Sequence, residues 1–210
     1  MVNFNVAAWG GTDDSAAYFA TAEATASRAL SLAPDNAFTH VILGLVLGFT
    51  KRAERAMAHC ERALALDRNL AAAHGMMGLY VVLLGRAEEA EAAVQEALRL
   101  SPRDPWAFAW LWSVGMAKSF LDRPEEAVVW LRRSLDSNRN YPPTHFYLAA
   151  AFTQLERPDE ARSSVNAGLA LDQRFTLERF RLSAESDNPI YLARRERLID
   201  HLRQAGVPEA

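Results

Sequence analysis

The chain has 210 residues, half of them hydrophobic, and a formal net charge of −3 from 23 basic and 26 acidic residues. Such a chain can bury a sizeable core, and its composition excludes general disorder. The charges are interspersed, so there is no basic stripe of the kind that phosphate backbones require, and nucleic acid is not an expected ligand.

No segment predicts export or membrane insertion. The start, MVNFNVAAWGG, lacks the basic residues and long apolar run of a signal peptide. The longest apolar run, from Val41 to Phe49, is about half of the ~20 residues that a membrane-spanning helix needs. Cys60 is the single cysteine, so a disulfide within the chain is excluded. We expect a cytoplasmic protein that does not contact membranes.

The first predicted helix runs to about Leu32, after capping oxygens at Asp13, Asp14 and Ser15. Its small residues lie 34 positions before those of a later helix, and a proline that follows it falls where a later copy also ends in proline. The segment 14–34 therefore resembles the second half of a repeat that lacks its first helix.

The stretch from Ala71 to Asp104 is a helix-turn-helix unit, and the segments around it are imperfect copies. Moving it by 34 residues toward the N-terminus aligns Gly78 with Gly44 and Ala90 with Ala56. A glycine inside a helix costs about 1 kcal/mol relative to alanine. We therefore expect each glycine to face the alanine of its partner helix and to permit a short distance between the two axes.

The phase slips by three residues at Pro105-Trp106-Ala107, and the 34-residue period then returns. The sequence thus predicts one domain over residues 1–210. Its predicted complete helix pairs are 37–70, 71–104, 108–141 and 142–175.

The tail 176–210 departs from the repeat. It predicts a short helix from Leu177 to Leu182, a loop, and an amphipathic helix from Ile190 to Ala205 that Gly206 ends. The arginines expected on the solvent side of that helix are Arg194, Arg195 and Arg197. We expect it to cover the apolar end of the last repeat, as a C-terminal capping helix does in a solenoid.

This pattern resembles the tetratricopeptide repeat family. The matching features are the 34-residue period, the pairs Leu43-Gly44 and Met77-Gly78 in first helices, alanines Ala56, Ala90, Ala127 and Ala161 in second helices, and the closing prolines Pro34 and Pro102. The resemblance covers about residues 14–175 and implies an all-α fold, a right-handed α-α superhelix. The large aromatic residue that the family carries early in each first helix is replaced by His40, His74, Leu111 and His145.

A narrower resemblance involves RALSLAPDNAFTHVILGLVL and the ending FTLERFRLSAESDNPIYLARRERLIDHLRQAGVPE. Both are similar to the C-terminal repeat region of bacterial class III adenylate or guanylate cyclases and related winged-helix regulators. In those proteins the repeats follow a catalytic or DNA-binding domain. The resemblance implies a sensor or interaction region, and it transfers no catalytic residue.

No pattern predicts catalysis, a cofactor or a metal. A glycine-rich phosphate loop, a G-x-S-x-G elbow and an H-E-x-x-H helix are all absent from the sequence. His40, His74 and His145 recur at one repeat position, but equivalent helices about 10 Å apart cannot share an ion whose bonds are about 2.0–2.1 Å long. We expect these histidines to pack, and Cys60 to be a small buried hydrophobe.

The family's first helices line a concave groove, and the resemblance places eleven apolar residues there. They are Phe38, Val41, Leu45, Phe49, Leu79, Val82, Leu83, Trp112, Met116, Phe120 and Phe146. Basic residues are nearly absent from this surface, so the clamp that captures chaperone tails in some relatives is not matched. An apolar groove suits an amphipathic helix or an extended peptide. The tryptophan-rich third pair is the candidate hot spot, although its rings would also fill space at the phase slip.

Three hypotheses of function follow from these features. The first is a non-enzymatic module that binds a protein or peptide partner in the groove. The second is a regulatory region of a cyclase or transcription regulator that senses a small apolar ligand between the third and fourth pairs. The third is a module for homodimer or higher oligomer formation through an exposed N-terminal end.

Overall fold

A computed structural model describes residues 15–210, and every regular element in that range is a helix. The elements are α2 (Ser15–Leu32), α3 (Ala37–Phe49), α4 (Ala53–Leu66), α5 (Ala71–Leu83), η1 (Ala87–Glu89), α6 (Ala90–Leu100), α7 (Ala107–Phe120), α8 (Pro124–Ser137), α9 (Pro142–Gln154), α10 (Pro158–Leu171), α11 (Leu177–Leu182) and α12 (Pro189–Ala205). The prediction of an all-helical solenoid is confirmed. The predicted capping residues Asp13 and Asp14 lie outside the described residues.

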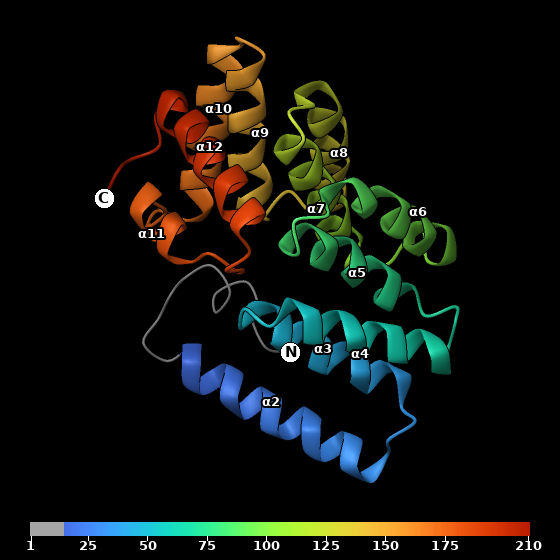
Figure 1. The fold of residues 1–210 in the computed structure, drawn as a ribbon. Coiled ribbons are helices and arrows are strands. Elements are labelled where there is room, and N and C mark those ends of the chain that lie inside the picture. Colours follow the sequence, from blue (N-terminus) through green and yellow to red (C-terminus); the bar gives the residue numbers. More distant parts are fainter. Residues whose placement is uncertain (1–14) are drawn as a thin grey trace.

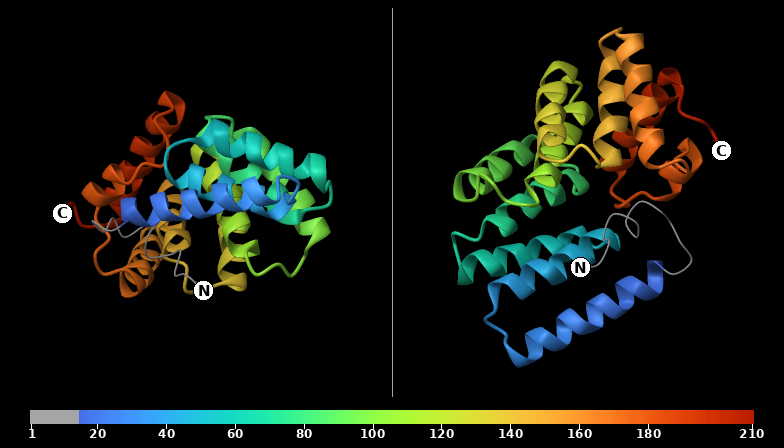
Figure 2. Two further views of the ribbon diagram at one scale, coloured as in Figure 1. Left: turned by 90° about the horizontal axis from the view of Figure 1, so that it is seen from below. Right: turned by 180° about the vertical axis from the view of Figure 1, so that it is seen from behind.

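The helices form a ladder of antiparallel pairs that runs from α2 to α10 (Figures 1 and 2). Successive first helices contact one another, in the order α3, α5, α7 and α9, whereas the second helices α4, α6, α8 and α10 make at most marginal contacts with each other. A stack that is closer on one side than on the other must curve. The first helices therefore line the inner face, and the second helices lie outside.

The predicted close approach within pairs is confirmed. A Cβ atom added to Gly44 would lie 3.2 Å from the carbonyl oxygen of Ala56, and one added to Gly78 would lie 3.3 Å from that of Ala90. Both alanines are fully buried. In these two pairs the helices thus approach so closely that the glycine hydrogen faces the backbone of the partner helix, which explains why the sequence keeps a poor helix former there.

The turn inside each pair contains one residue with left-handed backbone geometry. These residues are Lys51, Gly85, Asp122 and Glu156, with φ of 60°, 82°, 55° and 55°. The next residue in each turn is an arginine whose N–H bonds a carbonyl oxygen five residues earlier, which satisfies one of the free carbonyls at the end of the first helix. Only Gly85 adopts this geometry without the Cβ penalty.

The recurring histidines hold the loops between repeats. Each Nε2 bonds the carbonyl oxygen of the residue six positions earlier, and because a carbonyl can only accept, Nε2 carries the proton. The pairs are His40 with Pro34 at 3.1 Å, His74 with Arg68 at 3.2 Å and His145 with Arg139 at 3.0 Å. Leu111 has the same repeat position but no donor, and the loop before it spans residues 101–106, longer than the loops 33–36, 67–70 and 138–141.

The long loop at the phase slip places tryptophans mainly in the core. Trp110 is 2% exposed and lies against Gly75, whose added Cβ would approach the indole ring to 2.3 Å. Trp130 is buried beside it in the same apolar cluster, and Arg133 covers its ring at 4.3 Å. Trp106 stays half exposed on the loop and stacks on Phe108. The interpretation of Trp130 as a core residue is confirmed.

Replacing Glu156 by glycine is expected to stabilise the fold by about 1 kcal/mol, because glycine removes the steric cost of the left-handed conformation. Urea unfolding of the two proteins measures the change. The opposite substitution, Gly85→Ala, should destabilise the fold, since its Cβ would meet Asn188 Oδ1 at 2.9 Å and Ile190 Cβ at 3.1 Å. A loss of stability in Glu156→Gly would contradict the assigned backbone geometry.

Candidate functional site

A narrow apolar crevice, with no internal space large enough for a water molecule, lies between α3 and α5 on the inner face. Its walls include Leu45 and Phe49 of α3 and Met76 and Leu79 of α5, all of them partly buried, and the carboxyl of Glu185 closes one end. We call this the α3–α5 crevice. Two further side chains continue its α3 wall at helical spacing toward the N-terminal end of that helix. They are Ile42 and Phe38, which are 36% and 57% exposed.

The other half of the inner face is covered by the chain itself. Helix α12 contacts α9 and α7, and it also contacts α10 and α11 (Figure 1). Tyr191 of α12 packs edge-on against Phe120 of α7 with ring centroids 5.7 Å apart, and Leu198, Ile199 and Leu202 are buried. The predicted cap therefore contacts the last repeat, as expected, and it also reaches back along the inner face.

This placement separates the predicted groove residues into two groups. Phe38, Leu45, Phe49 and Leu79 are exposed or partly buried. The other seven side chains are only 0% to 4% exposed. They are Val41, Val82, Leu83, Trp112, Met116, Phe120 and Phe146. Leu83 still lines the α3–α5 crevice from within, whereas the other six are buried and do not line it, so these six have a different place from the one expected. Phe146 illustrates the reason, because its ring stacks on Phe175 at 3.6 Å, between the last repeat and the tail.

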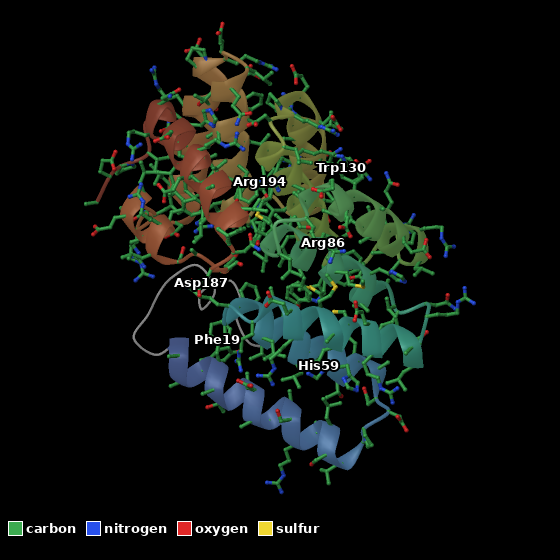
Figure 3. The ribbon with its side chains drawn as sticks, viewed as in Figure 1. Phe19, His59, Arg86, Trp130, Asp187 and Arg194 are labelled. Carbon is green, nitrogen blue, oxygen red and sulfur yellow. The ribbon has the colours of Figure 1, made fainter. Side chains whose placement is uncertain are left out.

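Polar contacts fix the start of the C-terminal segment to the turns of earlier repeats. Ser186 Oγ donates to the carbonyl oxygen of Leu83 at 2.7 Å, and Asn188 Nδ2 donates to that of Leu84 at 3.1 Å. Further contacts pair Arg194 with the Gly85 carbonyl at 3.2 Å, Arg197 with Asp122 at 2.8 Å and Lys51 with Asp187 at 2.8 Å. Figure 3 shows Asp187 and Arg194 along this edge of the ladder. The segment thus joins three separate repeats.

A cluster of buried polar side chains lies beneath α12, and it corrects one expectation. Arg195, predicted on the solvent side, is 2% exposed. Its guanidinium lies 3.7 Å from the Phe180 ring centroid and donates to the Tyr191 hydroxyl at 2.9 Å and the Phe180 carbonyl at 2.5 Å. A cation excluded from water needs such partners, and the aromatic face and carbonyl supply them. The hydrophobic pattern of α12 gave no sign of this burial.

The carboxyl group of Glu185 lies in the same region. Its side chain is 8% exposed, and its Oε2 atom has no hydrogen-bond partner within the described chain. Burial raises the pKa of this carboxyl, and the nearby Arg195 charge opposes the rise. The Glu185 carboxyl, which closes one end of the crevice, is therefore desolvated, and its charged form is disfavoured.

Two findings concern metal binding and thiol chemistry in the described residues. No three His, Cys, Asp or Glu side chains in residues 15–210 lie close enough together to hold a metal ion. Burial raises the pKa of the Cys60 thiol to about 12, so this thiol is not a nucleophile near neutral pH. No helix within the same range is long and apolar enough to cross a membrane.

Sequence reasoning missed Ile42 and Met76, which belong to the accessible wall. Their signal was present, because Ile42 follows Phe38 by four residues and precedes Leu45 by three, which is the spacing of one helix face. Met76 is the equivalent of Ile42 one repeat later. The error came from choosing large side chains by type before testing which face of the helix each one occupies.

Comparison with known proteins supports a tetratricopeptide repeat protein. Residues 39–70, which span most of the first helix pair, match the family model described as tetratricopeptide repeat. No curated protein matches the sequence. The resemblance to cyclase-associated repeats and the cytoplasmic location are not addressed by these findings and stay predictions.

Solved structures show the same fold. YrrB, described as a TPR protein with an unusual peptide-binding site, is 23% identical, with 84% of this chain and 91% of that chain covered and a TM-score of 0.55. PilW, a type IV pilus biogenesis factor, is 18% identical over 85% of this chain and 83% of its own, with a TM-score of 0.67. MamA is 17% identical over 74% and 90%, with a TM-score of 0.58.

Glu185→Gln is expected to raise the free energy of unfolding at about pH 7. Because the folded-state pKa of Glu185 is raised, its protonated form contributes stability at low pH, and this contribution is lost as pH rises through the folded value. A neutral amide avoids that loss, so its advantage should shrink toward about pH 4, near the ordinary glutamate pKa. Urea unfolding at both pH values measures the difference.

Glu178→Gln is the matched control, because Glu178 is an exposed glutamate of α11. Its removal should change stability little at either pH. A destabilised Glu185→Gln at about pH 7 would show instead that the carboxylate has a stabilising partner.

Proposed function

We propose that this protein is a non-enzymatic interaction module that binds one apolar face of a partner helix or extended peptide in the α3–α5 crevice. One observation carries the proposal: α12 covers only the half of the inner face that α7 and α9 form. The remaining half keeps accessible apolar side chains on two neighbouring helices. Apolar surface that the fold does not bury is typical of binding sites.

The chain's own C-terminal helix indicates what such a face accepts. Helix α12 presents Tyr191, Leu198, Ile199 and Leu202 to the first helices, with spacings of seven, eight and eleven residues from the first to the others. These spacings form one stripe of a helix. A partner helix with bulky apolar residues in a similar stripe would suit the open half, because both halves are built from equivalent positions of the repeat.

Charge narrows the class of partner further. The residues of the crevice are uncharged except for Glu185, whose carboxyl is buried at one end. No lysine or arginine lines it, so it offers no cation for a terminal carboxylate or an acidic motif. Affinity must then come from apolar anchors, as in helix-in-groove recognition. The peptide-binding description of YrrB agrees in kind with this proposal.

The test selects ligands from a phage-displayed library of helical peptides and measures their affinity by fluorescence anisotropy. We expect selected peptides to carry bulky apolar residues at spacings of three or four. Phe38→Arg and Met76→Arg should each weaken binding by about tenfold or more, which corresponds to about 1.4 kcal/mol. Both positions are at least partly accessible, so an arginine can reach water and the fold should be retained.

Val129→Arg provides the matched control, because Val129 is 58% exposed on the outer helix α8. It adds the same charge away from the crevice and should leave affinity unchanged. Equal binding by wild type and both crevice variants would overturn the proposed site. Trp112 and Phe120 are unsuitable for this test, since both are buried and an arginine there would disturb the core.

A further inference from the structure

A pair of histidines from two helices forms the base of a basic pocket on the first helix pair. His40 Nδ1 of α3 and His59 Nδ1 of α4 are 2.9 Å apart, and His40 Nε2 lies 3.1 Å from the Pro34 carbonyl oxygen. Because the carbonyl only accepts, His40 carries its proton on Nε2. Its Nδ1 therefore accepts from the Nδ1–H of His59, and the lone pair of His59 is on Nε2.

Two arginines complete this pocket, which has a volume of about 270 Å³. Its lining consists of His40, Arg55, Ala58, His59 and Arg62, with no carboxylate among them. The pocket lies on the side of α4 toward α2, where Figure 3 shows His59. Four of its five lining residues come from one stripe of α4, at spacings of three, four and seven.

The charges around the pocket leave one cation unpaired. Glu23 of α2 is held by Arg52 through two contacts of 2.7 and 2.6 Å, and the exposed Asp35 pairs with Arg62 at 3.1 Å. Within the described chain Arg55 has no hydrogen-bond or ion-pair partner. Glu23 is thus neutralised by Arg52, and Asp35 lies at the rim of the pocket. The pocket therefore keeps a net positive charge.

The other repeats show that the fold does not require this cluster. The residues at the position of Arg55 are Glu89, Glu126 and Glu160, and those at the position of His59 are Ala93, Trp130 and Ser164. Each of the three glutamates accepts an ion pair from a basic residue of its own repeat. The first repeat thus carries Arg55 where the other three carry a glutamate. It is also the only one of the four with a histidine at the position of His59.

We infer that this pocket binds a phosphoryl group, either as free phosphate or on a phosphorylated side chain. Two guanidinium groups of an open pocket can each donate to the oxygens of a tetrahedral dianion, and His59 can add a third donor once its Nε2 is protonated. Protonation there preserves the bond between the two imidazoles, because His59 still donates from Nδ1. The inference is independent of the α3–α5 crevice.

The pH dependence follows from the groups that face His59. These are His40 of α3 and Arg55 and Arg62 of α4; behind them, Asp35 of the preceding loop pairs with Arg62, and Glu23 of α2 lies near Arg55. Burial is the main cause that lowers the pKa of His59, and His40 and Arg55 add to it. A bound dianion opposes these effects and favours the protonated form, so binding and proton uptake should strengthen each other.

The experiment titrates the full chain with inorganic phosphate, with a phosphoserine peptide and with the same peptide unphosphorylated, using NMR shifts of the histidine rings. The His59 signals should move on phosphate binding, and the unphosphorylated peptide should leave them unchanged. Tighter binding of the phosphopeptide than of phosphate would identify the side-chain source. Sulfate, a dianion throughout the range, should bind more tightly as the pH falls from about 8 toward the ordinary histidine pKa of about 6.5.

Arg55→Glu is the decisive variant, because glutamate is the residue of all three other repeats and should be tolerated by the fold. It is expected to weaken phosphate binding by about tenfold or more. Arg68→Glu makes the same charge change at an exposed site outside the pocket, and its affinity should stay within about twofold of wild type. Unchanged binding in Arg55→Glu, or an equal loss in Arg68→Glu, would overturn the site.

Discussion

The packing of α12 against the inner face determines which side chains of this protein are buried. A curved stack of first helices presents a continuous apolar surface, and full burial of a large apolar side chain is worth roughly 1.5–3 kcal/mol. Tyr191, Leu198, Ile199 and Leu202 obtain that burial by lying on α7 and α9 rather than beyond the last repeat. The same contact excludes water from Arg195 and Glu185, so the apolar gain offsets the cost of two desolvated ionisable groups.

The local part of the fold could be predicted from the sequence, because helix periodicity and capping act over a few residues. The bounds of α11 and the end of α12 at Gly206, with φ of 97°, follow from such signals. The place of α12 could not be predicted in the same way. An amphipathic pattern shows that one face of a helix is covered, but it does not identify which surface tens of residues away covers it.

The candidate site shows the same limit of prediction from sequence. Phe38 and Leu79 were predicted on the groove and are accessible, whereas Phe120 and Phe146 were assigned by the same rule and are buried. The rule assumed that equivalent positions in a repeat have equivalent surroundings. That assumption fails where a non-repeating segment packs on only some of the repeats. Burial of Arg195 is a further consequence, since charge predicted solvent exposure and tertiary packing reversed it.

Because the fold repeats, each residue can be compared with the equivalent residues of the other repeats. The histidines at one position share a single structural role, a bond to the preceding loop, so their recurrence needs no ligand to explain it. Arg55 is different, because it reverses the charge that three equivalent residues carry and has no hydrogen-bond or ion-pair partner within residues 15–210. A side chain that the fold requires should recur at the equivalent position of the other repeats. One that occurs in a single repeat must be explained by something outside the repeat's own packing, and a bound anion is the partner that two arginines and a histidine would recognise.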